Sequence, residues 1–99
     1  RLGDEHSAAL TRAQLGMLAL NQGRALLAGE RLAEAARGFA TLRDEHHAQQ
    51  AAIGLLQAWV ASGPADRQIL EVKWSGAGLG AFPKELAAEV ERQAKASGT

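Results

Sequence analysis

The first apolar stretch of the chain predicts a long helix over residues 7–28. The stretch contains no proline, and apolar residues recur at spacings of three, four or seven, namely Leu10, Ala13, Met17, Leu20 and Leu27. A second apolar stripe consists of Leu15, Leu18 and Leu26. We therefore expect this helix to be covered on two sides. Gly29 is a natural end for it, while the weak helix formers at 21–23 leave a kink or a break as the alternative.

Two further helices are predicted before residue 64. The second runs from about residue 31 to residue 46, with one apolar face made by Leu32, Ala35, Phe39 and Leu42. The third carries the apolar residues Ala52, Leu55, Leu56, Trp59 and Val60. It ends at Ser62-Gly63-Pro64, because the proline ring cannot continue a helix.

The last third of the chain predicts two more helices with a glycine-rich loop between them. Pro64 and Pro83 each suit the first position of a helix, and the loop covers residues 75–81. Residues 69–74 alternate between apolar and polar side chains, yet they also fit one face of a helix. We expect a short helix there, because a single strand would have no partner. A short strand over 69–74 is the alternative.

Composition supports an all-α fold in one domain over residues 1–99. Hydrophobic residues make up 46% of the chain and most of them are Ala or Leu, which favour helices. A chain of 99 residues is too short to divide its core between two domains. The chain starts at Arg1 rather than at Met, which suggests a processed chain or a segment of a larger protein.

Charge and cysteine content exclude several classes of protein. Eleven basic residues balance eleven acidic ones, so nothing indicates the basic surface that binds nucleic acid. The absence of cysteine excludes disulfides, cysteine zinc sites and a thiolate nucleophile. No apolar run reaches the length of a membrane span. We expect a soluble cytoplasmic protein, although the lack of cysteine alone leaves the compartment open.

The segment from Gly23 to Phe39 resembles part of a tetratricopeptide repeat. A small residue, a glycine turn, a Glu-Ala pair and an aromatic residue follow in the order of that family, here as Gly23, Gly29, Glu34-Ala35 and Phe39. A second similarity pairs Leu15-Gly16-Met17-Leu18 with Ile53-Gly54-Leu55-Leu56. The resemblance implies two stacked antiparallel helical hairpins, a C-terminal capping helix, and a groove that binds a partner helix or peptide without catalysis.

We expect this groove to lie between the first and third helices, as in an adaptor or a chaperone-like protein. The candidate contacts are Met17, Leu20, Arg24, Gln57 and Trp59. A second candidate surface is an exposed apolar patch made by Trp74, Leu79 and Phe82. The alternative function is a structural or regulatory helical domain of a larger protein, which forms a homodimer through the same apolar surface.

The histidines are the only candidates for metal chemistry. His46 and His47 are adjacent, so on a helix their side chains point about 100° apart and do not share a metal ion. We interpret residues 44–47 as a solvated helix end and predict no metal site. Only a fold that brings His6 to His46 or His47 would change this, and the sequence does not show whether these residues converge.

Two other patterns carry no chemistry that we expect to be real. Gly76-Ala77-Gly78-Leu79-Gly80-Ala81 fits a dinucleotide-binding fingerprint, but the chain ends before a βαβ unit could form, so we predict no cofactor. No serine stands in a Gly-x-Ser-x-Gly frame. We therefore expect a protein that is not an enzyme.

Overall fold

The computed structural model of the chain describes residues 2–97 and contains five α-helices. These are α1 (Leu2–Asn21), α2 (Ala25–Thr41), α3 (Glu45–Val60), α4 (Pro64–Gly76) and α5 (Lys84–Ser97). The predicted all-α class is confirmed, and no strand occurs between residues 2 and 97. Residues 69–74 lie within α4, so the helix expected there is confirmed and the strand alternative is wrong. No helix in this range is both long and apolar enough to cross a membrane.

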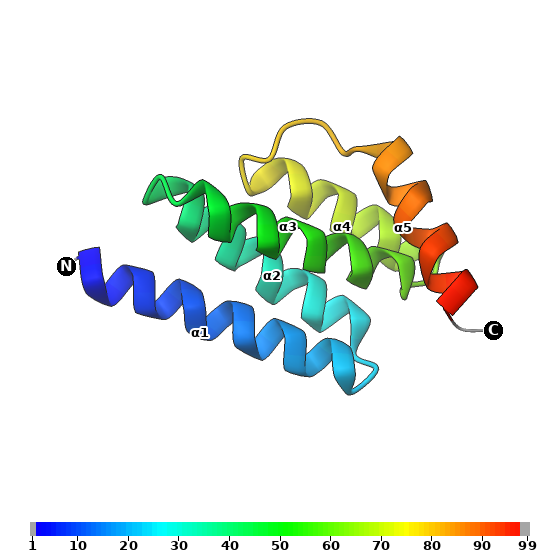
Figure 1. Cartoon of the computed structure of the whole chain (residues 1–99), viewed down its shortest axis with the longest axis horizontal. Helices are drawn as coiled ribbons and strands as arrows, with labels where there is room; N and C mark the ends of the chain where they lie inside the picture. Colours follow the sequence, from blue (N-terminus) through cyan, green and yellow to red (C-terminus); the bar gives the residue numbers. More distant parts are fainter. Residues whose placement is uncertain (1, 98–99) are drawn as a thin grey trace.

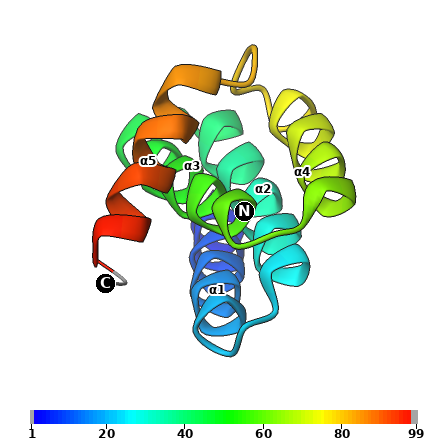
Figure 2. The same ribbon diagram turned by 90° about the vertical axis from the view of Figure 1, so that its right-hand side faces the viewer.

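The first three helices run side by side and reverse direction at each short turn (Figure 1). α2 packs against both α1 and α3, whereas α1 and α3 touch each other only slightly. α4 packs on α2 and α3, and α5 packs on α3 (Figure 2). α1 and α5 therefore lie at opposite edges of the molecule, and α2 and α3 form its centre.

The first helix ends seven residues earlier than the sequence predicts, and the turn lies at residues 22–24. Gly23 has φ +78°, the left-handed conformation that glycine adopts without strain. The backbone N–H of Arg24 donates to Ala19 O (2.9 Å) and that of Gly23 donates to Leu20 O (3.1 Å). This is a Schellman cap. The continuous helix over 7–28 is wrong, and the alternative break at 21–23 is what the structure contains.

The second turn repeats this geometry without a glycine. Arg43 has φ +59°, and the backbone N–H of Asp44 donates to Phe39 O (2.9 Å) while that of Arg43 donates to Ala40 O (3.0 Å). α2 therefore ends at Thr41 rather than at residue 46. Asp44 is the N-cap of α3, because its Oδ1 accepts a hydrogen bond from the backbone N–H of His47 (3.2 Å).

Gly29, which we expected to end the first helix, lies inside α2 and serves packing instead. A Cβ atom at this position would lie 2.4 Å from Cδ2 of Leu70, a fully buried residue of α4. The glycine turn that the tetratricopeptide resemblance places at Gly29 is therefore wrong, because residues 25–41 form one helix. The small side chain lets α2 and α4 approach closely.

The two similar segments of the sequence meet at the centre of the fold. A Cβ atom at Gly16 would lie 2.7 Å from Leu32 Cγ, and one at Gly54 would lie 3.0 Å from Leu32 Cδ1. α1 and α3 thus each present a glycine to the same leucine of α2. Around this contact the core consists mainly of alanines and of five fully buried large side chains, Phe39, Leu32, Leu55, Leu56 and Leu70.

The Arg67 side chain caps the C-terminal end of α3 by donating to its free backbone carbonyl groups. Its Nε donates to Trp59 O (2.9 Å) and to Ser62 O (3.1 Å), and its Nη2 donates to Val60 O (2.9 Å). The positive charge of Arg67 is also stabilised there by the negative end of the dipole of α3. The same Nη2 donates to Glu91 Oε2 (2.7 Å), which connects α4 to α5.

Candidate functional site

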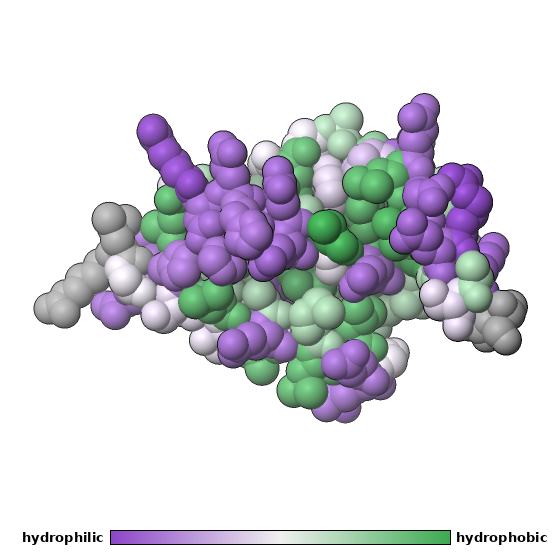
Figure 3. Space-filling model, in the orientation of Figure 1, coloured by the Kyte–Doolittle hydropathy of each residue, from purple (hydrophilic) through white to green (hydrophobic). Residues whose placement is uncertain are grey.

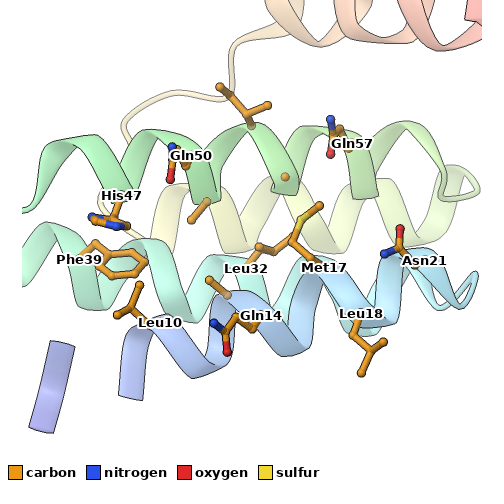
Figure 4. A pocket seen from close by; sticks show the side chains of 14 residues that line it. Leu10, Gln14, Met17, Leu18, Asn21, Leu32, Phe39, His47, Gln50 and Gln57 are labelled. Carbon is orange, nitrogen blue, oxygen red and sulfur yellow. The ribbon is translucent and has the colours of Figure 1, made fainter. Parts of the chain in front are cut away.

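A groove runs between α1 and α3 and has a volume of about 670 Å³ (Figure 4). α2 closes it from behind with Leu32 and Phe39, which are both about 1% exposed. Gly54 keeps the α3 side of the groove open, since it has no side chain to fill it. Met17 reaches from α1 across the groove, and a Cβ atom at Gly54 would lie 3.2 Å from its sulfur.

Large aliphatic side chains stay exposed along both walls of the groove. Met17 is 40% exposed and Leu18 is 52% exposed on α1, and Ile53 is 52% exposed on α3. Hydrophobic groups gather between hydrophilic ones on this face of the molecule (Figure 3). Because a monomer in water gains nothing from leaving such side chains open, a gathered set of them is typical of a surface that another protein covers.

Apart from His47, the polar residues of the groove are amides. They are Gln14 and Asn21 on α1 and Gln50 and Gln57 on α3. Among the residues that the structure describes, no Asp, Glu, Lys or Arg lines the groove, and His47 is its one ionisable side chain. The site therefore offers an apolar floor and hydrogen-bonding edges without a fixed charge.

Two of the five contacts predicted for this groove line it, Met17 and Gln57. Leu20 is half-buried and packs against the core, and Arg24 lies exposed in the turn after α1. Ile53 and Gln50 also line the groove, although they are not among the contacts that the sequence predicts. Gln50, Ile53 and Gln57 follow each other at spacings of three and four, so a search for one polar-edged face of α3 would have found them.

Trp59 lies outside this groove, on the side of α3 that meets α4 and the loop before α5. The Arg67 guanidinium carbon lies 4.0 Å from the centre of its ring, and its Nε1 donates to Glu71 Oε2 (3.1 Å). The ring of Phe82 lies 5.3 Å away. Trp59 therefore joins α3 to α4 and to the loop before α5.

The exposed patch predicted from Trp74, Leu79 and Phe82 is wrong. Trp74 is only 6% exposed, and Leu79 and Phe82 are half-buried against the core. The edge of Trp74 meets Phe82 with 5.8 Å between ring centres. The chain after α4 folds back so that Phe82 packs on the edge of Trp74, while Trp74 and Leu79 line a shallow hollow on this side of the molecule. The glycine pattern that starts at Gly76 follows a helix and not a strand.

A second polar cluster lies where the N-terminal half of α1 passes the turn between α2 and α3. His6 Nε2 lies 2.8 Å from Asp44 Oδ2, and His47 Nδ1 lies 2.6 Å from the same oxygen. His6 and His47 thus converge, as the sequence could not show. His46 stays outside the cluster, exposed and beside Gln50.

Hydrogen bonds from the histidines stabilise the charged form of Asp44. The hydrogen bond from His6 and the bond from the backbone N–H of His47 lower the pKa of Asp44 from 3.8 to about 2, against the opposing effect of burial. The ring of Phe39 supports both imidazoles: it stacks on His47 with 5.1 Å between centres and meets His6 edge-on at 5.6 Å. Asp44 is therefore an anion held between two oriented rings.

Compared with protein-family models, curated proteins and solved structures, the chain matches none of them. The groove between α1 and α3 and the cluster of His6, Asp44 and His47 therefore carry the functional argument.

Proposed function

We propose that this chain is a non-catalytic protein–protein interaction module that binds a helix of a partner protein in the groove between α1 and α3. The observation that carries the proposal is the pair of exposed aliphatic walls above a closed apolar floor. Covering the exposed half of a Leu, Ile or Met side chain stabilises a complex by about 1 kcal/mol. Met17, Leu18 and Ile53 together therefore supply a useful part of a micromolar affinity.

The chemistry of the groove defines the partner. An amphipathic helix places apolar side chains at positions i, i+3 or i+4, and i+7, which suits a long groove between two helices. The four amides at its edges favour uncharged polar side chains beside that apolar stripe. A charged residue would lose its water here without meeting an opposite charge, so the groove disfavours it.

The arrangement of the helices supports the same function. α2 packs against both α1 and α3 and so forms a fixed floor for the groove, while α4 packs on α2 and α3 and α5 packs on α3, which leaves the open side of the groove free for a partner. The composition of the groove supports binding rather than catalysis, because its lining is aliphatic side chains and amides apart from the single imidazole of His47 at one end.

The test uses a synthetic helical peptide of about 18 residues, long enough to form a helix, with Leu at i, i+3, i+4 and i+7 and mostly Gln and Ala elsewhere. We expect micromolar binding by calorimetry, with amide chemical-shift changes centred on Gln14, Ile53 and Gln57. Ile53→Glu should weaken binding at least tenfold, because it places a charge in the apolar wall. Val72→Glu is the matched control, since Val72 is 72% exposed on α4 and does not line the groove.

Two results would contradict the proposal. Peptide binding that Ile53→Glu leaves unchanged would place the interaction elsewhere, and no binding by any peptide of this pattern at millimolar concentration would remove the groove as a helix site. Sedimentation of the free chain distinguishes the alternative: a dimer that Ile53→Glu dissociates would show that the groove pairs with a second copy.

A further inference from the structure

The cluster of His6, Asp44 and His47 brings together the atoms that bind a transition metal. Each residue offers one ligand atom, and the three atoms lie within 4.8 Å of one another. Two imidazole nitrogens with one carboxylate oxygen are a common donor set for zinc and related divalent ions. The residues come from α1 and from the start of α3, 38 positions apart from His6 to Asp44, so the fold and not a local motif assembles the set.

We propose that His6 Nε2, Asp44 Oδ2 and His47 Nδ1 bind a divalent transition metal ion, with zinc as its most suitable occupant.

The present spacing is close to what such an ion requires. Metal–ligand bonds of about 2.0–2.2 Å in a tetrahedral zinc site place neighbouring ligand atoms about 3.3–3.5 Å apart. The two nitrogens lie 2.8 and 2.6 Å from the Asp44 oxygen, so each nitrogen–oxygen pair must separate by less than 1 Å, and the two nitrogens lie within 4.8 Å of each other. The proton on each of these nitrogens moves to the other ring nitrogen or to water, which leaves a lone pair for the ion.

The surroundings hold the ligands in place before the ion arrives. Asp44 Oδ1 accepts from the backbone N–H of His47, which fixes the carboxylate while Oδ2 faces the histidines. Phe39 stacks on one imidazole and supports the other. Such outer contacts orient the ligands of protein metal sites.

The cluster is also open to solvent. The side chains of His6 and His47 are 36% and 37% exposed, and that of Asp44 is 22% exposed. An ion can therefore enter from water, and a water molecule can supply the fourth ligand. The bound ion would link α1 directly to the turn between α2 and α3.

The experiment measures zinc binding to the full chain by calorimetry, and cobalt binding by its visible spectrum. We expect one ion per chain and cobalt bands of tetrahedral intensity. His6→Gln and His47→Gln should each raise the zinc Kd at least tenfold, because each removes one of three ligands. His46→Gln is the matched control: it removes an adjacent, exposed histidine of the same helix and should change the Kd less than twofold.

Asp44→Asn separates metal binding from folding. Asn is as good an N-cap as Asp, so this variant keeps the start of α3 while it loses the anionic ligand. Zinc should raise the Tm of the wild type and of His46→Gln, and it should not raise the Tm of Asp44→Asn. The proposal fails if the wild type binds no zinc at millimolar concentration, or if His46→Gln weakens binding as much as His6→Gln does. In the first case the cluster is a hydrogen-bonded cap only, and in the second case zinc is not bound by the three proposed ligands.

Discussion

Arg43 occupies a backbone conformation that usually belongs to glycine. Its φ of +59° costs a residue with a Cβ atom about 1–2 kcal/mol. Glycine avoids that cost but loses more freedom on folding, so Arg43→Gly should stabilise the fold by about 0.5–1 kcal/mol, or a few degrees in Tm.

Thermal unfolding of Arg43→Gly and Arg43→Ala tests this explanation. Both variants lose the same side chain, but alanine keeps the Cβ atom that causes the strain. Arg43→Ala should therefore show none of the gain. If the two variants have equal Tm values, the left-handed conformation is not what limits stability at this turn.

Gly29 makes the opposite prediction, because here the added atom would meet the core. In Gly29→Ala the new Cβ atom would lie 2.4 Å from Leu70 Cδ2, and Leu70 is fully buried and cannot turn away freely. We expect a loss of about 1–3 kcal/mol, as in other overpacked cores. Urea unfolding gives the free energy directly.

The matched control for Gly29 is Gly76→Ala at the end of α4. No atom lies within 4 Å of the Cβ atom added there, so this variant should be neutral or slightly stabilising. A Gly29→Ala variant as stable as Gly76→Ala would show that α2 and α4 do not need this close contact.

At the scale of whole helices, α5 is attached to α4 by an ion pair. The hydrogen bond from Arg67, together with its charge, lowers the pKa of Glu91 from 4.5 in spite of burial. A carboxylate whose folded pKa is lowered stabilises the fold above its unfolded pKa, and it loses this effect as the pH falls through the folded pKa. The contribution of Glu91 should therefore be complete at pH 7 and fade in acid below about pH 4.5.

Glu91→Gln should accordingly lower the Tm at pH 7, and its difference from the wild type should shrink as the pH falls toward 3. Glu89→Gln is the control on the same helix, since Glu89 pairs with Arg92 within α5 and connects no second helix. It should lower the Tm less. A Glu91→Gln variant whose Tm deficit stays constant from pH 7 to pH 3 would contradict the role given to the Arg67 pair.

Across the whole molecule, local signals predicted the elements better than their boundaries. Proline at 64 and 83 marked the starts of α4 and α5 to within a residue. The first boundary failed because Gly23 and Gly29 look alike in the sequence, although one makes a turn and the other a helix contact. The turn at Arg43 has no sequence signal, because arginine has no preference for positive φ.

For the candidate site, some groove contacts could be predicted from the sequence, but the meeting of the histidines could not. The faces of the first and third helices pointed to Met17 and Gln57, because a helical repeat shows which side chains share a face. The meeting of His6 with Asp44 depends on where α1 and α3 are placed along α2, against which both pack. Gly16 and Gly54 set that placement by their contact with Leu32, which only the packed structure shows.

Both tryptophans lie outside α1: Trp59 is in α3 and Trp74 is in α4. Trp74 is buried and Trp59 is covered by Arg67, and neither lines the groove or the histidine cluster. The intrinsic fluorescence of this protein therefore reports on α3, α4 and the loop before α5. It is largely insensitive to whether α1 is folded. Emission consequently observes the part of the chain around α3 and α4, whereas circular dichroism observes all five helices including α1, so the agreement of the two signals during unfolding measures how strongly α1 is coupled to the rest.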